Sequence, residues 1–238
     1  MSTLIENVAK VKSAHAALKT AIAEKGVAVP EGAKLTDMPA LVGEISTKPV
    51  PTNQRAVFAY DTATNLVVQN PMVVDMTTME DLSRCFYHCE ALTSLTLPSG
   101  FGRNATDLGS CFFYCKALIS LTLPSGFGQN ATNLGSCFYG CSSLTSLTLP
   151  SGFGRNATNT NRCFASCPKL TDITGNPNFK VSFSLSDSRK LTRDSLMVVI
   201  NGLQNTTTAK TLTLGTTNLA KLTDEEKKVA TDKGWTLA

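Results

Sequence analysis

Eight cysteines are the residues with the clearest capacity for chemistry, and all of them lie between residues 85 and 167. They form four C-x-x-x-C pairs, which begin at Cys85, Cys111, Cys137 and Cys163. Thiols at this density can build a disulfide scaffold, hold zinc as thiolates, or fill a core as small apolar side chains. The pairs recur every 26 residues. An internal repeat therefore sets their positions.

The spacing favours buried, reduced thiols over the other two roles. Two cysteines one helical turn apart, or in register on neighbouring coils, rarely reach disulfide geometry. A four-thiolate zinc site could be built from two adjacent pairs, but four identical pairs are more typical of packing than of one site. Both alternatives stay open, and we predict no metal and no cofactor.

His88 stands beside a cysteine pair, which is an arrangement that could ligate a metal or activate a thiol. The equivalent residues in the following units are Tyr114, Gly140 and Ser166. None of these side chains is an imidazole, so those units cannot share a role that needs one. We therefore expect this position to be exposed and tolerant of substitution.

Three Asn-Ala-Thr triplets match the acceptor sequence for N-glycosylation. They begin at Asn104, Asn130 and Asn156 and are copies of one repeat position, so we interpret them as turn residues. The chain contains no C-x-x-C redox pair, nucleophile elbow, phosphate loop or H-E-x-x-H motif. We predict no catalytic residue and no enzymatic activity.

Each 26-residue unit predicts a short strand followed by a loop. The motif L-x-x-L-x-L ends in a two-residue alternation that places leucines on an inner face and hydroxyl side chains on an outer face. Pro98 and its copies stop the strand. Cys85, Cys89 and Leu92 fall at i, i+4 and i+7, which predicts a short helical segment before the strand.

The outer strand face and the loops are the candidate binding surface, because hydroxyl groups beside aromatic rings suit a carbohydrate or a protein partner. Its predicted members are Ser94, Thr96, Ser120, Thr122, Ser146, Thr148, Phe101, Phe127 and Phe153. Packing of the phenylalanines under their own coil is the alternative for those three residues.

A unit of this kind cannot bury its own apolar face, so the units must stack. The predicted fold class is an α/β repeat solenoid, leucine-rich-repeat-like, with about 26 residues per coil. An α-helical segment is predicted at the N-terminus.

The units resemble the BspA-like leucine-rich-repeat proteins of bacterial surfaces and bacteriophage genomes. The resemblance is carried by Cys-Phe-Tyr-Gly-Cys-Ser-Ser-Leu-Thr-Ser-Leu-Thr-Leu-Pro at 137–150 and by Asn-Ala-Thr-Asn-Leu-Gly-Ser at 130–136. It is strong over residues 70–175, and the ending at 221–237 is similar to that of related repeat proteins in phage genomes. Such motifs specify the fold better than the function.

The N-terminal segment, residues 2–25, predicts a helix with an a/d stripe. Thr3 and Glu6 form a capping box, and Gly26 suits the C-terminal end. The stripe predicts an oligomerisation or attachment surface and hence a homo-oligomer, in which a histidine at the interface could tune assembly with pH. The stripe consists of Leu4, Val8, Val11, His15, Leu18 and Ile22.

Four regions follow from these patterns. We predict a helical attachment or oligomerisation region (1–48), a linker with an N-terminal capping coil (49–84), the leucine-rich-repeat solenoid (85–175) and C-terminal α/β capping repeats (176–238). Within the last region we expect helices over 192–203 and from Thr223 to Gly234, and strands at 210–215 and 235–237.

The composition and the apolar pattern argue against nucleic-acid binding and against membrane insertion. A net charge of +4 from 22 basic and 18 acidic residues is too weak for a nucleic-acid partner. No run of eighteen apolar residues occurs, and the start lacks the features of a signal peptide, so neither membrane insertion nor export by the usual route is expected.

We therefore predict a non-enzymatic virion structural protein of a bacteriophage: a head or tail fibre, an appendage or a capsid-decorating subunit, assembled in the host cytoplasm. Its N-terminal helices would bind other virion proteins, and its repeats would contact a host surface protein or glycan. The alternatives are a bacterial cell-surface leucine-rich-repeat adhesin and a thiol-based metal-binding protein.

Overall fold

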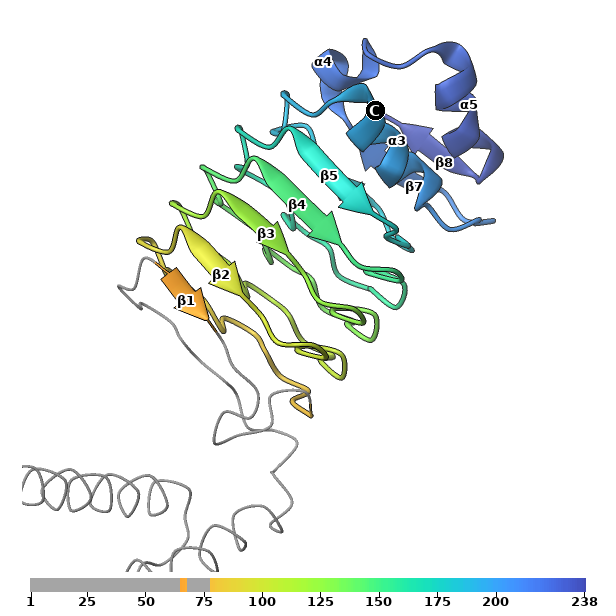
Figure 1. Cartoon of the computed structure of the whole chain (residues 1–238). Helices are drawn as coiled ribbons and strands as arrows, with labels where there is room; N and C mark the ends of the chain where they lie inside the picture. Colours follow the sequence, from red (N-terminus) through yellow and green to blue (C-terminus); the bar gives the residue numbers. More distant parts are fainter. Residues whose placement is uncertain (1–64, 68–77) are drawn as a thin grey trace, which may run out of the picture. The chain divides into compact units, whose positions relative to one another are not determined.

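Short parallel strands, one in each repeat unit, are the first regular feature of the fold (Figure 1). The computed structural model describes residues 65–67 and 78–238. The strands of the repeats are β1 (Asn65–Val67), β2 (Ser94–Thr96), β3 (Ser120–Thr122), β4 (Ser146–Leu149) and β5 (Asp172–Gly175). β1 pairs with β2, and β3, β4 and β5 form a second parallel sheet. The predicted strands are confirmed.

The 26-residue period sets the register between strands. Leu121 is paired with Leu147, and Leu147 is paired with Ile173. Equivalent residues of successive units therefore lie side by side, and each inward-facing leucine meets another apolar side chain in the core.

The expected N-terminal helix and linker lie outside the described residues. This holds for the whole predicted stripe, which comprises Leu4, Val8, Val11, His15, Leu18 and Ile22.

Before each strand the structure has consecutive turns, and the helical segment predicted there is wrong. The Phe86 amide donates to the Cys111 carbonyl of the next unit at 2.8 Å, whereas the Cys89 amide turns back to the Phe86 carbonyl at 3.3 Å. His88 has φ 57°, a left-handed conformation that interrupts helical bonding. A helix is about 10 Å wide, and neighbouring strands lie about 4.8 Å apart. Helices side by side on this face would lie farther apart than the strands, whereas these turns bond directly to the next unit.

Two ladders of phenylalanine fill the space between the strands and these turns. Phe86, Phe112 and Phe138 stack with ring centroids 5.2 and 5.4 Å apart. Phe101 and Phe127 belong to the second ladder, with centroids 6.1 Å apart. All five rings are fully buried, so every unit contributes two aromatic side chains to one continuous core.

In the C-terminal section, helices appear between the strands. Its elements are β6 (Phe183–Ser184), α3 (Arg193–Asn201), β7 (Lys210–Thr213), α4 (Gly215–Leu219), α5 (Asp224–Asp232) and β8 (Trp235–Leu237). The strands β6, β7 and β8 form a third parallel sheet, while helix α3 packs beside β5 (Figure 1). Ser195 Oγ on α3 accepts a hydrogen bond from the Ile173 amide at 2.9 Å. The helix thus covers the edge of β5, which would otherwise be open.

The sequence-based expectations for this section are largely confirmed. The two longer helices and the strands β7 and β8 are present near the predicted bounds, and α4 is an element that the sequence did not predict. Thr223 and Glu226 form both bonds of the predicted capping box, at 3.2 and 2.9 Å. In the described part of the chain, no helix has the length and apolar character needed to cross a bilayer. The described part of the chain is leucine-rich-repeat-like and consists of short parallel strands with few helices.

The phenylalanine ladders should dominate the stability of the repeats. We expect Phe127→Ala to lower the free energy of unfolding by about 3–5 kcal/mol, because it removes a fully buried ring between two stacked neighbours. Chemical denaturation followed by circular dichroism measures the loss.

The matched control is Ile119→Thr in the same unit. Ile119 is 52% exposed, and the equivalent residues Thr93 and Thr145 are already threonine, so the change should be less than about 0.5 kcal/mol. Equal effects of the two substitutions would contradict the ladder as the main source of stability.

Candidate functional site

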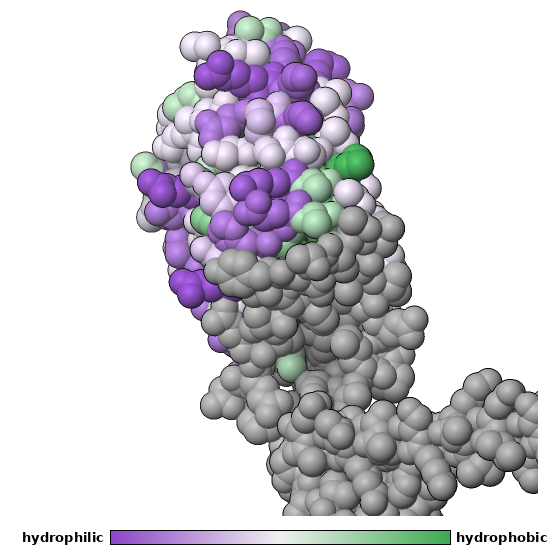
Figure 2. Space-filling view, turned by 90° about the vertical axis from the view of Figure 1, so that its left-hand side faces the viewer, coloured by the Kyte–Doolittle hydropathy of each residue, from purple (hydrophilic) through white to green (hydrophobic). Residues whose placement is uncertain are grey.

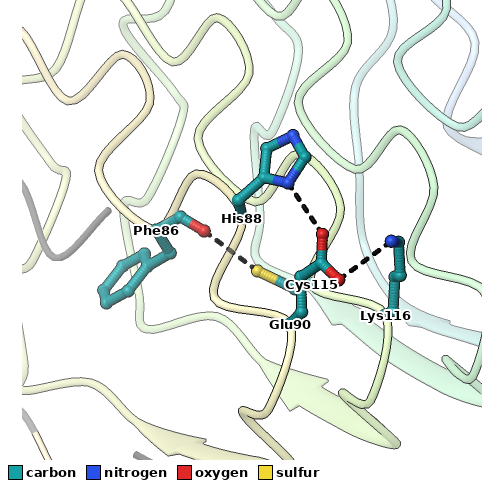
Figure 3. Close-up of polar contacts among 5 residues, drawn as sticks. All are labelled: Phe86, His88, Glu90, Cys115 and Lys116. Carbon is teal, nitrogen blue, oxygen red and sulfur yellow. Dashed lines mark hydrogen bonds and ion pairs between the residues drawn. The ribbon is translucent and has the colours of Figure 1, made fainter. Parts of the chain in front are cut away.

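All eight thiols are buried and free, and the prediction that they are buried is confirmed. Cys115 Sγ donates to the Phe86 carbonyl oxygen at 3.1 Å (Figure 3), and the same bond recurs in the next two units. Burial raises the pKa of Cys167 to about 12 and raises the pKa of Cys141 well above its usual value. The thiolate form, which attacks electrophiles and binds zinc, is therefore disfavoured.

His88 bonds to a carboxylate, and its ring nitrogen is directed toward Glu90 (Figure 3). Its Nδ1 lies 2.8 Å from Glu90 Oε1, and Lys116 Nζ lies 2.9 Å from Glu90 Oε2. The hydrogen bonds from Lys116 and then from His88 lower the pKa of the Glu90 carboxyl. The cluster links two neighbouring units on the surface.

The position of His88 is half-buried, so the expected exposure is wrong. Its tolerance of different side chains has a backbone cause. Tyr114, Gly140 and Ser166 all have positive φ there, at 56°, 74° and 59°. A shared left-handed turn is what this repeat position requires, and glycine meets that requirement at the lowest cost.

The Asn-Ala-Thr triplets tie units together. Asn130 Nδ2 donates to the Arg103 carbonyl of the preceding unit at 3.0 Å, and Thr132 Oγ1 donates to the Thr106 carbonyl at 3.2 Å. The nitrogen that glycosylation would modify is therefore part of a hydrogen bond between units. These contacts account for the triplets as structural residues.

The predicted hydroxyl groups lie together on the outer face of the strands. On β2 and β3 the four members are exposed, and on β4 both are partly exposed. Thr148 Oγ1 lies 2.9 Å from Thr174 Oγ1, so the row continues onto β5, where the sequence had not placed a member. We call this set the hydroxyl row. It consists of Ser94, Thr96, Ser120, Thr122, Ser146, Thr148 and Thr174.

Phe101, Phe127 and Phe153 are not part of the surface, and their predicted place in a binding site is wrong. All three are fully buried. A Cβ atom built on Gly102 would lie 2.5 Å from the ring of Phe127, which shows how closely the loop backbone covers the ring. The alternative of packing under their own coil is the correct one.

Two surface features were not predicted from the sequence. Tyr87, Phe113 and Tyr139 form a half-buried stack with centroids 5.0 and 4.9 Å apart. Their faces cover one another, so this row supports the stacking of units more than it offers a platform to a ligand. The signal was the third position of each unit, which is aromatic in three successive copies.

The second feature is a shallow polar groove of about 370 Å³. Asn133 Nδ2 donates to Asp107 Oδ1 at 2.9 Å, and Asn159 Nδ2 donates to Asn133 Oδ1 at 2.9 Å. The face in Figure 2 is mostly hydrophilic or neutral where its residues are described. Among the described residues, Ile119 is the large hydrophobic side chain classed as exposed.

A family model for the BspA type leucine-rich repeat region matches residues 58–189 in six copies. The chain belongs to this family. The match covers more than half of the 238 residues and begins before the first of the four cysteine-containing units. The predicted BspA-like repeat is confirmed, whereas the bacteriophage setting stays a prediction. No curated protein and no solved structure gives a significant match.

The buried thiols of this BspA-type protein should resist thiol reagents. We expect slow labelling of the native protein near neutral pH and labelling of all eight cysteines in denaturant, because burial suppresses the thiolate. A colorimetric thiol count under both conditions measures the difference. Fast labelling of the native protein would contradict the packed core.

The same burial makes stability depend on pH. The ordinary pKa of a cysteine thiol is about 9, whereas burial raises the pKa of Cys167 in the folded protein to about 12. Between these two pH values the folded state therefore binds more protons than the unfolded state. The free energy of unfolding should fall as pH rises from about 9 to about 12. Denaturation midpoints across this range measure the effect, and Cys167→Ala should make the slope shallower. An unchanged slope would count against a contribution from this thiol.

Proposed function

We propose that this BspA-type repeat protein is a non-enzymatic adhesive protein whose hydroxyl row contacts a host surface protein or glycan. The observation that carries the proposal is the row itself, with exposed hydroxyls repeated at the spacing of the strands. Each hydroxyl can donate and accept a hydrogen bond. A surface of this kind suits a hydroxylated or amide-bearing partner.

We propose further that the repeats form one continuous solenoid with about 26 residues per coil. Supporting this, backbone bonds such as Ser110 to Gly135 and Ser136 to Asn161, both 2.8 Å, join equivalent places in successive units. A solenoid presents an extended surface, which gives a row of weak contacts enough length to act together.

Within this class we favour a bacteriophage virion protein: a head or tail fibre, an appendage or a capsid-decorating subunit. In this proposal the N-terminal helices join it to other virion proteins and make it a homo-oligomer, and it assembles in the host cytoplasm. Eight reduced thiols suit assembly in a reducing cytosol followed by release through lysis. The alternative is a bacterial cell-surface leucine-rich-repeat adhesin. A thiol-based metal-binding protein has less support because burial raises the thiol pKa values.

Particles that lack the protein test the virion proposal. We expect such particles to lose one protein band and to adsorb more slowly to host cells. Unchanged particle composition together with unchanged adsorption would overturn the virion role. Finding the protein on bacterial cells in the absence of phage particles would favour the adhesin.

The strand face can be tested by a single charge. Thr122 is exposed on β3, in the middle of the hydroxyl row. We expect Thr122→Lys to weaken binding of the labelled, purified chain to host cells by roughly tenfold, because a long cation blocks the row and disrupts neighbouring hydroxyl contacts.

Ser125→Lys is the matched control. Ser125 lies in the same unit and is exposed in the turn after Pro124. The substitution adds the same charge at a position outside the hydroxyl row. It should retain binding within about twofold. Equal losses for the two variants would assign the effect to charge alone and argue against the strand face.

A further inference from the structure

A recess of about 460 Å³ lies where the regular repeats meet the C-terminal section. Four segments form its wall: the loop at Arg155, the loop after β5 (176–178), the last residue of α3 with the residues that follow it (201–205), and Lys233 before β8. The recess depends on the position where α3, instead of a further strand, packs beside β5.

Hydrogen bonds hold the wall in a fixed shape. Gln204 Nε2 donates to the Arg155 carbonyl at 3.0 Å and to the Asn178 carbonyl at 3.3 Å. Trp235 Nε1 donates to the Gln204 carbonyl at 2.7 Å, and the Phe179 amide donates to the Gly202 carbonyl at 2.7 Å. The recess is therefore preformed, as ligand sites usually are.

The charge of the recess is positive. Its charged lining residues are Arg155 and Lys233, and the lining holds no carboxylate side chain. Lys233 Nζ donates to the Ile200 and Asn201 carbonyls at 3.1 and 2.6 Å, which fixes an ammonium group at the end of α3. The Arg155 guanidinium is exposed and makes no ion pair with another described residue. A guanidinium can bind a carboxylate through two parallel hydrogen bonds.

The remaining polar wall is made of amide side chains. Asn176, Asn178, Asn201 and Asn205 each bring a donor and an acceptor, which is the pairing that a sugar hydroxyl needs. Pro177 also lines the recess but is itself buried. A guanidinium beside several amides matches a ligand that has both a carboxylate and hydroxyl groups.

We propose that this recess binds an acidic sugar, a carboxylate-bearing unit of a surface polysaccharide, with the carboxylate on Arg155 and the hydroxyls on the asparagine amides. The proposal rests on the adhesive function proposed above and names a ligand class for it. The other surfaces fit such a ligand less well. The hydroxyl row offers no cation among its serines and threonines. The lining of the polar groove holds one cation, Arg84, and one carboxylate, Asp107, so it carries no net positive charge for an acid.

Titration calorimetry of the full chain tests the proposal with oligosaccharides of glucuronic acid, and with neutral glucose oligosaccharides of equal length as the comparison. We expect the acidic series to bind at least roughly tenfold more tightly. Arg155→Gln should remove most of that difference. Glutamine already occupies the equivalent position as Gln129, so the fold accepts it.

Arg103→Gln is the matched control, because Arg103 has the same position in an earlier unit and does not line the recess. It should leave the acidic series unaffected. Equal binding of acidic and neutral sugars, no binding of the acidic series, or an equal loss for both arginine variants would overturn the proposal. Displacement of the sugar by inorganic phosphate at equal concentration would reduce the recess to a general anion site and would also overturn it.

The two proposals fail separately. If Thr122→Lys abolishes cell binding while the acidic series does not bind, the recess proposal fails and the strand-face function stands. If Arg155→Gln abolishes sugar binding while Thr122→Lys binds cells normally, the recess stands and the strand-face function fails.

Discussion

Hydrogen bonds between neighbouring units hold the 26-residue repeats at the spacing of a β-sheet, and every other feature must fit that spacing. In the turns before each strand, alternate amides donate to the next unit, as Phe86 does to Cys111, while the intervening amides close local turns. Left-handed residues such as Arg84 and His88, with φ 55° and 57°, make this alternation possible. Helices on that face would lie about twice as far apart as the strands, so direct bonds between the turns of neighbouring units would be lost there. The helices α3 and α5 lie in the C-terminal section, where β6, β7 and β8 still pair in parallel.

The same spacing decides which side chains remain for function. Each unit must fill its interior with flat or small groups that repeat at about 5 Å, and stacked phenylalanines with cysteine thiols beside them do so. Chemistry based on those thiols is thereby suppressed. What reaches the surface is a set of repeated polar rows, of which the hydroxyl row is one. Where the repetition ends, at the junction with α3, four unrelated segments meet and create a recess that no single unit encodes.

The repeat made much of this structure predictable from the sequence. Alternating leucines around Ser94 and Thr96 gave the strands and their outer face, and the capping box at Thr223 gave the start of α5. The helical segment at Cys85 was wrong because i, i+4 spacing also fits turns whose amides bond to another unit, and one unit alone does not reveal its neighbour's carbonyls. The loop phenylalanines were wrongly placed on the surface because the close approach of the Gly102 backbone to Phe127 is a tertiary contact. The recess depends on residues that lie far apart in the chain, from Arg155 to Lys233, and carries no local signal.

Hydrogen-bond couplings measured by NMR test the alternation of amide bonds most directly. With nitrogen-labelled phenylalanine and carbonyl-labelled cysteine, the account predicts through-bond correlations from Phe86 to Cys111, from Phe112 to Cys137 and from Phe138 to Cys163, because each pair is joined at 2.8 Å. A second sample with carbonyl-labelled leucine should show no coupling from Phe112 to Leu108. Correlations to Leu108, with none to the cysteine of the next unit, would indicate helices within units and would contradict the account.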